Sequence, residues 1–420
     1  MKLDGKLIKW HRNKNRLTQE QLAENICSVT QLSKIENNQI KANDEILVAI
    51  AQRLKIPEMK LTNSIEPNHE EMVHQFLTAI HEHDIPNAKK LNKKISELNC
   101  DELHYDIEFL CILAQFGYLL MMKELRQADE LHELVAEYDE IFEEVDPYSF
   151  HKFIGDYLIN KGFFIDARSH LLQAKSLIPD HEDPELYILL AVVNSHLENI
   201  LTSNGYARRA LRILQEKLYY SRIIECEIIL SSNHTFVNEY NVAKEQLDRL
   251  VSLIDQKFDP NSTVKIYFHL SLIHVVSRNF EEAIRLLNKN LELNVNQTEL
   301  MHSRYLLAHI YYLMREERKA FDLIEKGESI AKEHELNYYL VKFKVLKLII
   351  EEKEKELVEY LTKRAIPFFR LTGQAFDLRY YYQLLGHTLY KMKKYKKAAE
   401  IFMAADEQRK RFLEYNLTES

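Results

Sequence analysis

Glycine and proline are scarce in this sequence, with eight of each among 420 residues. Sandwiches, barrels and glycine-rich phosphate loops need many tight turns, and such turns depend on these two residue types. Hydrophobic residues make up 46% of the chain and charged residues 29%, which is a globular composition. We therefore expect an all-α protein, too long for one ordinary core and built as two domains or a repeat array.

Features of secreted, membrane and catalytic proteins are also missing. The four cysteines form no CxxC pair, and the N-terminal residues show no secretory signal. No window approaches the roughly 18 apolar residues of a membrane span. No HExxH, GxSxG, GxxxxGK(S/T) or GxGxxG motif occurs. These absences predict a cytoplasmic protein without membrane contact, enzymatic activity, cofactor or metal.

The charge is divided unevenly along the chain. Residues 1–66 hold eleven Lys and Arg against eight Asp and Glu, a net charge of +3. The remainder carries 45 basic and 56 acidic residues, a net charge of −11. A mildly basic head can approach phosphates while an acidic body stays away from them, so the division supports nucleic-acid binding by the head alone.

Capping signals in residues 3–65 predict a head of five short helices. Thr18 begins the second helix, and Gln21, three residues later, completes a capping box. Ser28 caps a third helix and Asn43 a fourth, while Pro57 opens a fifth. The third helix would present short polar groups and one cation on its outward face, which suits insertion into a major groove.

TQEQLAENICSVTQLSKIENNQI followed by ILVAIAQRLKIP resembles the lambda-repressor-like (XRE/Cro) helix-turn-helix family. One departure is that the usual glycine between the two central helices is absent and the turn is about one residue shorter. In that family the Gln opening the second helix contacts phosphate, and base contacts come from the outward face of the third helix. The residues predicted to bind DNA are Gln19, Ser28, Thr30, Gln31, Ser33 and Lys34.

Beyond a short linker at residues 65–68, small residues recur at fixed steps. Gly155, Ala167, Leu171 and Ala174 are separated by steps that recur from Ala308, from Gly386 and, more loosely, from Ser271. A small residue late in one helix lets the next helix cross closely, and the pattern resembles the tetratricopeptide repeat. Nine helix pairs are predicted: 68–99, 101–140, 148–180, 184–218, 221–256, 262–295, 300–335, 338–372 and 378–412.

Such pairs should stack into a right-handed superhelix with a concave inner surface lined by the first helix of each pair. The predicted organisation is thus a DNA-binding domain at 1–66 and a repeat domain at 67–420, which would bind peptide and mediate oligomerisation. A head of this type on nine repeats resembles the RRNPP peptide-pheromone regulators, in particular the NprR-like branch, which is related to PlcR.

That resemblance implies a quorum-sensing transcriptional regulator. A short signalling peptide in the concave groove would switch its oligomeric state and its binding to a pseudo-palindromic double-stranded promoter site. Extended peptides expose backbone amides, which side-chain amides and charges can pair. The inward candidates by spacing are Asp156, Asn160, Asn194, Asn199, Arg304, Tyr305, His309, Tyr312, Gln383 and His387. A homodimer or higher homo-oligomer is expected, because one weakly basic head binds DNA weakly.

Two other functions stay open from the sequence. The chain could sequester a response regulator of the sporulation phosphorelay when peptide is absent, through residues 68–140. It could also be a phage-type repressor that has no peptide ligand. The run His81-Glu82-His83-Asp84 is interpreted as a helix end rather than a metal site, since neighbours on a helix point in different directions.

Overall fold

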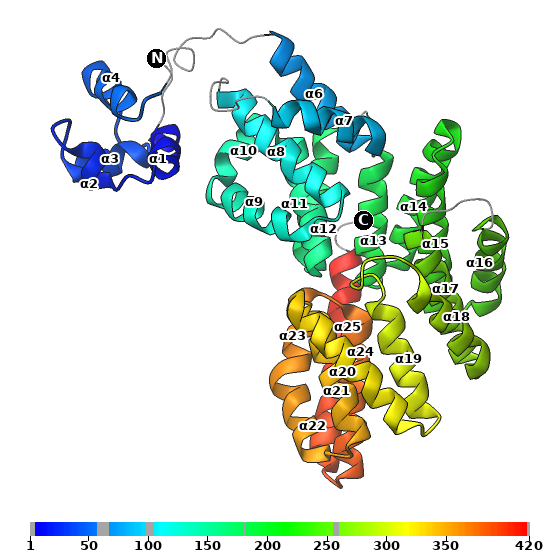
Figure 1. The fold of residues 1–420 in the computed structure, drawn as a ribbon. Helices are drawn as coiled ribbons and strands as arrows, with labels where there is room; N and C mark the ends of the chain where they lie inside the picture. Colours follow the sequence, from blue (N-terminus) through cyan, green and yellow to red (C-terminus); the bar gives the residue numbers. More distant parts are fainter. Residues whose placement is uncertain (1–4, 57–66, 98–104, 180, 255–259, 418–420) are drawn as a thin grey trace. The chain divides into compact units, whose positions relative to one another are not determined.

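The computed structural model describes residues 5–56, 67–97, 105–179, 181–254 and 260–417, drawn as a ribbon in Figure 1. Within these ranges every regular element is helical and no strand occurs, which confirms the all-α prediction. None of the described helices is both long and apolar enough to cross a bilayer.

Four helices of the head are described: α1 (Gly5–Lys14), α2 (Gln19–Ala23), α3 (Val29–Glu36) and α4 (Asp44–Arg53). The predicted caps are confirmed. Thr18 and Gln21 form a capping box on α2, the Ser28 side chain caps α3, and the Asn43 side chain caps α4. The predicted fifth helix, from Pro57, lies outside the described residues.

The remaining helices form nine pairs within the described part of the chain, as predicted. The first elements are α6 (Pro67–His81), α7 (Ile85–Ser96), α8 (Tyr105–Met121), α9 (Leu125–Glu137), α10 (Asp139–Val145), α11 (Pro147–Lys161) and α12 (Phe164–Leu177). Next come α13 (Pro184–His196), α14 (Ile200–Lys217), α15 (Tyr220–Phe236), α16 (Tyr240–Ile254), α17 (Pro260–Val276) and α18 (Phe280–Glu292). The last are α19 (Met301–Leu313), α20 (Glu317–Glu333), α21 (Asn337–Ile350), α22 (Glu354–Tyr360), α23 (Ile366–Thr372), α24 (Ala375–Lys391) and α25 (Tyr395–Leu417), with a π-helical turn (Leu361–Ala365) joining α22 to α23.

The chain forms two compact units. The first comprises Met1–Tyr157 with Gln173–His181, and the second Leu158–Leu172 with Glu182–Ser420. The head therefore belongs to the same unit as the first repeats.

The turn inside each of the nine pairs has the same backbone form. One residue adopts a positive φ, between 53° and 82°: His83, Lys123, Gly162, Glu198, Asn238, Arg278, Arg315, Glu352 and Lys393. The N–H of the following residue then bonds a carbonyl five positions back, as in Glu124 N to Leu119 O at 2.9 Å. This is the Schellman arrangement that ends helices. Only one of the nine positions is glycine, so the repeated turn is not evident from the sequence.

The predicted small residues do lie where consecutive helices cross. Ala308, Ala320 and Ile324 have no exposed surface. A Cβ atom on Gly327 would lie 2.2 Å from the Phe343 ring, and one on Gly386 would lie 2.5 Å from the Phe402 ring. These glycines are therefore required because an aromatic ring occupies the place of a side chain. This packing confirms the repeat prediction.

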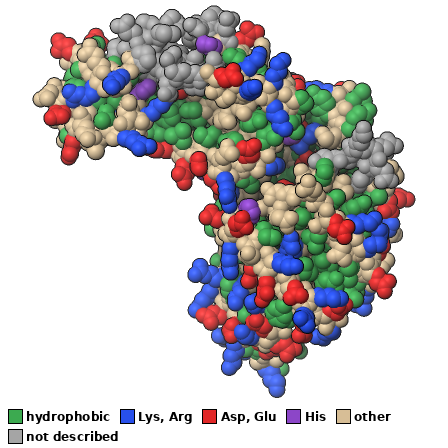
Figure 2. Space-filling model, in the orientation of Figure 1, with side chains coloured by type: hydrophobic (Ala, Val, Ile, Leu, Met, Phe, Trp, Pro, Cys, Tyr) green, Lys and Arg blue, Asp and Glu red, His purple; other side chains and the backbone are tan. Residues whose placement is uncertain are grey.

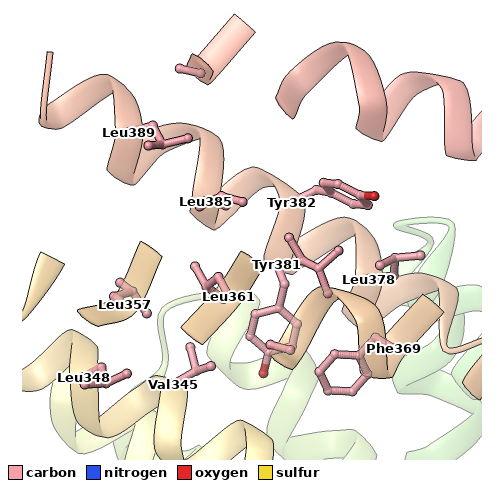
Figure 3. Close-up of a cluster of buried hydrophobic side chains, with 13 residues drawn as sticks. Val345, Leu348, Leu357, Leu361, Phe369, Leu378, Tyr381, Tyr382, Leu385 and Leu389 are labelled. Carbon is pink, nitrogen blue, oxygen red and sulfur yellow. The ribbon is translucent and has the colours of Figure 1, made fainter. Parts of the chain in front are cut away.

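The C-terminal repeats share an apolar core, shown in Figure 3. The Tyr381 ring of α24 stacks on Phe369 of α23, with 4.9 Å between ring centroids. Leu385 of the same helix and Leu348 of α21 extend the cluster. Outside this core, acidic and basic side chains alternate over the surface of the C-terminal repeats (Figure 2).

Candidate functional site

The outward face of α3 is open in the structure. Thr30, Lys34 and Ser28 are exposed, and Gln31 and Ser33 are half-buried. Leu32 and Ile35 of the same helix are buried in the head, which fixes the side that α3 presents. The Ser28 hydroxyl accepts a hydrogen bond from Gln31 N at 3.1 Å, so it holds the start of the helix. The five predicted α3 residues thus form one continuous surface of a size suited to a major groove.

The sixth predicted residue, Gln19, takes part in a buried charge network. Its side-chain amide donates to Glu36 at 2.7 Å, and Arg12 donates to the same carboxylate from Nε at 2.6 Å and from Nη2 at 3.1 Å. Glu36 is only 2% exposed. The network joins α1, α2 and α3 and so fixes the angle between the two central helices. No local sequence pattern indicates this network, because Arg12 and Glu36 stand 24 residues apart.

The turn between α2 and α3 explains the missing glycine. Asn25 takes the left-handed conformation there, with φ at 57°. Asparagine tolerates this region better than other non-glycine residues, because its short side chain can bond locally. Arg53 of α4 then donates to the carbonyl groups of Leu22 and Glu24, which close the end of α2. The shorter turn is therefore a stable variant of the motif.

In the second unit, an inner polar cluster links the first helices of three pairs. It consists of Tyr305 of α19, Tyr338 and Lys342 of α21, and Asp377 of α24. Lys342 Nζ lies 2.8 Å from Asp377 Oδ1 and 2.9 Å from Tyr338 Oη, and it lies 4.8 Å from the centroids of both tyrosine rings. Burial alone would lower the pKa of Lys342, but the Asp377 carboxylate and the neighbouring tyrosines together outweigh it and the pKa is raised. The cluster is therefore a paired charge between aromatic faces.

Neutral imidazoles surround this cluster. Burial lowers the pKa of His196 to about 4, of His269 to about 4 and of His302 to about 3. His302 also feels the charge of Lys342, which lowers its pKa further. His196 and His302 nevertheless keep water-accessible surface. These imidazoles and the inner polar cluster together are called the inner surface below. At neutral pH it accordingly offers uncharged ring nitrogens to a ligand, and the spacing in the sequence did not indicate these three histidines.

Three of the predicted peptide-binding residues lie at this inner surface. Tyr305 and His309 have ring centroids 6.3 Å apart, and His309 and Tyr312 are separated by the same distance. All three stand on one face of α19, at successive turns of the helix. They form an aromatic strip next to Lys342.

Other candidates have side chains committed inside the repeats. Asn194 is 1% exposed and donates to Leu190 O at 2.8 Å, while Asn199 donates to Asn194 Oδ1 at 3.3 Å. Arg304 is buried and donates to Gln297 at 2.8 Å, and burial lowers its pKa. The structure thus places these three within the helix pairs rather than on an open inner face.

Of the two candidates on α24, Gln383 lies on a different side of that helix from Asp377, whereas His387 lies close in angle to Tyr380. Six residues separate Asp377 from Gln383, a rotation of about 240° around a helix. His387 contacts the Phe402 ring of α25 at 5.4 Å, and both candidates are exposed. Asp377 bonds Lys342, and Tyr380 feels the charge of the same lysine. Asp156 and Asn160 of α11 are half-buried, each with polar or ring partners of its own.

The start of α24 also contacts helices far back in the sequence. Phe376 stacks on Phe236 of α15 with ring centroids 4.0 Å apart, and Arg379 pairs with Glu198 at 3.2 Å. A Cβ atom on Gly373 would lie 2.7 Å from the Ile165 side chain. Within the second unit, the last pair thus packs against elements that lie far earlier in the sequence.

The His81 motif has a packing role. His81 lies 2.8 Å from Ser149 Oγ and 3.1 Å from Lys152 Nζ, and its ring stacks on Phe153. Ser149 in turn donates to Asp146 at 2.6 Å. This chain of hydrogen bonds ties α6 to α11. Among the described residues no group of His, Cys, Asp and Glu is arranged to hold a metal ion.

Comparison with known proteins agrees with this architecture. A helix-turn-helix family model matches residues 8–61, and a tetratricopeptide repeat model matches residues 380–411. The transcriptional activator NprA of Geobacillus stearothermophilus is 25% identical over 401 residues, which cover 91% of this chain and 97% of NprA.

Two solved structures share the fold of the repeats. NprR in complex with its cognate peptide NprX gives a TM-score of 0.72 at 16% identity, covering 81% of this chain and 98% of that one. A Rap protein complexed with competence and sporulation factor gives a TM-score of 0.69 at 19% identity, covering 83% of this chain and 99% of that one.

A helix-turn-helix head followed by tetratricopeptide-like pairs defines a class of regulators with a DNA-binding domain and a helical solenoid. The chain is similar over most of its length to a transcriptional activator, and its repeats share the fold of two solved peptide complexes.

Proposed function

We propose that this protein is a quorum-sensing transcriptional regulator, acting in the cytoplasm, whose DNA binding and oligomeric state are switched by a short peptide on the inner surface of its repeats. The observation that carries the proposal is the presence of an open α3 face and of an aromatic strip beside a paired cation on the same chain. Named relatives support it, since one is a transcriptional activator and another was solved with a cognate peptide.

In this proposal residues 1–66 contact DNA and residues 67–420 bind peptide and form the homo-oligomer. The α3 residues Thr30, Gln31 and Lys34 would read base edges, while Gln19 would approach phosphate. A half-site contact by one head of low net charge is weak, so two heads on a pseudo-palindromic site are needed for specific affinity.

The inner surface favours a particular mode of peptide binding. Its imidazoles are neutral at pH 7, and its central cation is already paired with Asp377. A ligand would therefore gain more from backbone hydrogen bonds and ring contacts at Tyr305, His309 and Tyr312 than from new ion pairs.

The test is light scattering coupled to gel filtration, with and without synthetic peptides encoded beside the gene, and with promoter-DNA binding assayed on the same samples. A change in mass that tracks DNA affinity is expected. The His309→Ala substitution should weaken the peptide response and leave DNA binding in the absence of peptide intact. The control His334→Ala, at the C-terminal end of α20, should change neither property. No response to any peptide would leave a phage-type repressor.

A second candidate is sequestration of a response regulator through residues 68–140 when peptide is absent. The similarity of the repeats to the fold of a Rap protein supports this second function. Co-purification of a phosphorelay response regulator with the peptide-free protein, and its loss when peptide is added, would support this activity alongside the first.

A further inference from the structure

The only tryptophan of the chain lies between the head and the first repeats. Trp10 of α1 is 5% exposed, and its aromatic neighbours belong to the repeats rather than to the head. Its ring lies 4.9 Å from Phe109 of α8 and 4.9 Å from Tyr138, which stands between α9 and α10. Both partners are buried, and both lie in the same compact unit as the head.

Charges of opposite sign flank this aromatic contact. Lys14 Nζ lies 2.6 Å from Glu108 Oε1, and Glu108 is 1% exposed. Lys6 pairs with Glu140, and Lys9 lies 3.9 Å from Glu137. Three lysines on one face of α1 thus meet three glutamates on the repeats, as expected for a surface shaped to receive this helix.

Hydrogen bonds from Asn13 add directional contacts. Asn13 Nδ2 donates to Glu137 at 3.1 Å and to Tyr138 Oη at 2.8 Å. Burial raises the pKa of Tyr138, and the bond from Asn13 lowers it only in part. A hydroxyl that remains protonated and accepts from Asn13 fixes how α1 is rotated on the repeats.

From these contacts we infer that Glu108, Phe109, Glu137, Tyr138 and Glu140 form a docking surface for the head of the same chain. The head is therefore held in one orientation on the first repeats. The outward residues Thr30 and Lys34 of α3 take no part in the contact and stay exposed. Docking thus presents α3 at a fixed angle. Its consequence for DNA rests on the proposed function, but the docking itself does not.

Trp10 reports the contact directly, because its fluorescence is the only tryptophan signal of the full-length protein. A docked Trp10 should emit at short wavelength and resist acrylamide. Lys14→Glu places a second carboxylate beside buried Glu108, and the acrylamide quenching constant should rise about threefold. Combining Lys14→Glu with Glu108→Lys restores opposite charges and should return quenching towards the wild-type value.

A second charge exchange, at a more exposed pair, tests the same contact without a substitution at buried Glu108, which could disturb α8. Lys6→Glu should raise quenching less than Lys14→Glu does, because the Lys6–Glu140 pair is more exposed, and Glu140→Lys should reverse the change. Lys90→Glu, at an exposed position of α7 in the same unit, is the matched control and should leave quenching unchanged. Circular dichroism on each variant verifies that the helices are intact.

The inference would be overturned if acrylamide quenched Trp10 of the wild type as strongly as free indole. It would also be overturned if the quenching constant of Lys14→Glu equalled that of the wild type. Quenching that rises on dilution through the oligomer-to-monomer transition would instead assign the docked head to a second copy. Failure of every peptide to change DNA binding would refute the proposed function and leave the docking result standing.

Discussion

The head and the repeats are both built from short helices, but different contacts hold them together. In the head, side chains cap three of the four described helices, and one buried charge network joins α1, α2 and α3. In the repeats, α14, α15, α20 and α24 begin without a side-chain cap, and the helix pairs depend on small residues facing aromatic rings. The head is thus specified locally and the repeats by packing between neighbours.

This difference predicts where each region is vulnerable. Loss of one polar partner in the head removes a large share of the interactions that hold a small core. A repeat array distributes its stability over many interfaces, so one lost contact is felt mainly by the adjacent pairs. Matched substitutions in the two regions can measure the contrast.

The largest effect is expected from Glu36→Ala. It leaves the Arg12 guanidinium, which is mostly buried, without its carboxylate, and it removes the acceptor for Gln19. A broken buried pair of this kind costs about 3 kcal/mol. Thermal melting followed by Trp10 fluorescence should show the head destabilised, while far-ultraviolet circular dichroism should show the repeats melting as before. Glu24→Ala, at an exposed position, is the control, and an equal loss in both variants would contradict the network's role.

The corresponding change in the repeats is Lys342→Met. It should lower the free energy of unfolding by about 2 kcal/mol, because Asp377 and Tyr338 each lose a partly buried hydrogen-bond partner. Chemical denaturation followed by circular dichroism measures it. Adding Asp377→Leu removes the unpaired charge, so the double variant should be more stable than the single one. Lys344→Met on the same helix provides the control. A single variant as stable as wild type would show that the inner polar cluster is not stabilising.

The sequence predicts the head better than the inner surface for the same physical reason. A capping box needs residues three apart, such as Thr18 and Gln21, so the chain displays it directly. The Arg12–Glu36 bond spans 24 residues, and nothing in the local pattern indicates it. The small residues of each repeat recur at fixed steps, so nine helix pairs could be predicted.

Which face of each inner helix turns inwards could not be predicted in this way. On α19 the spacing selected Tyr305, His309 and Tyr312 together with the buried Arg304, and on α24 it selected Gln383 and His387 rather than Asp377, which bonds Tyr338. The rotation of a helix is set by its neighbours, and Lys342 and Asp377 meet across 35 residues. The nine turns with a left-handed residue could not be predicted either, because eight of those residues are not glycine.

A smaller effect should follow from Ser28→Ala. The Ser28 hydroxyl satisfies Gln31 N at the start of α3, and the loss of such a cap costs about 1 kcal/mol. Melting of the head and promoter-DNA affinity should both fall. Ser28→Asp retains an acceptor and should restore the stability. If Ser28→Ala weakens DNA binding without any loss of stability, the hydroxyl acts on DNA rather than as a cap.

The smallest expected effect belongs to the repeats and appears as pH dependence. His196, His269 and His302 have folded-state pKa values of about 4, 4 and 3, below the 6.5 of an unperturbed histidine. Below about pH 7.5 the unfolded chain binds more protons than the folded one, so stability is full well above pH 6.5, has begun to fall by pH 6.5 and falls further as the pH is lowered. Because His196 and His302 keep water-accessible surface, we expect a loss of only about 0.5 kcal/mol between pH 8 and pH 6.5. Denaturation of the wild type and of His269→Gln at both pH values measures it, and the variant should lose less stability. A stability that rises towards pH 6.5 in both proteins would show that these imidazoles are charged in the folded state.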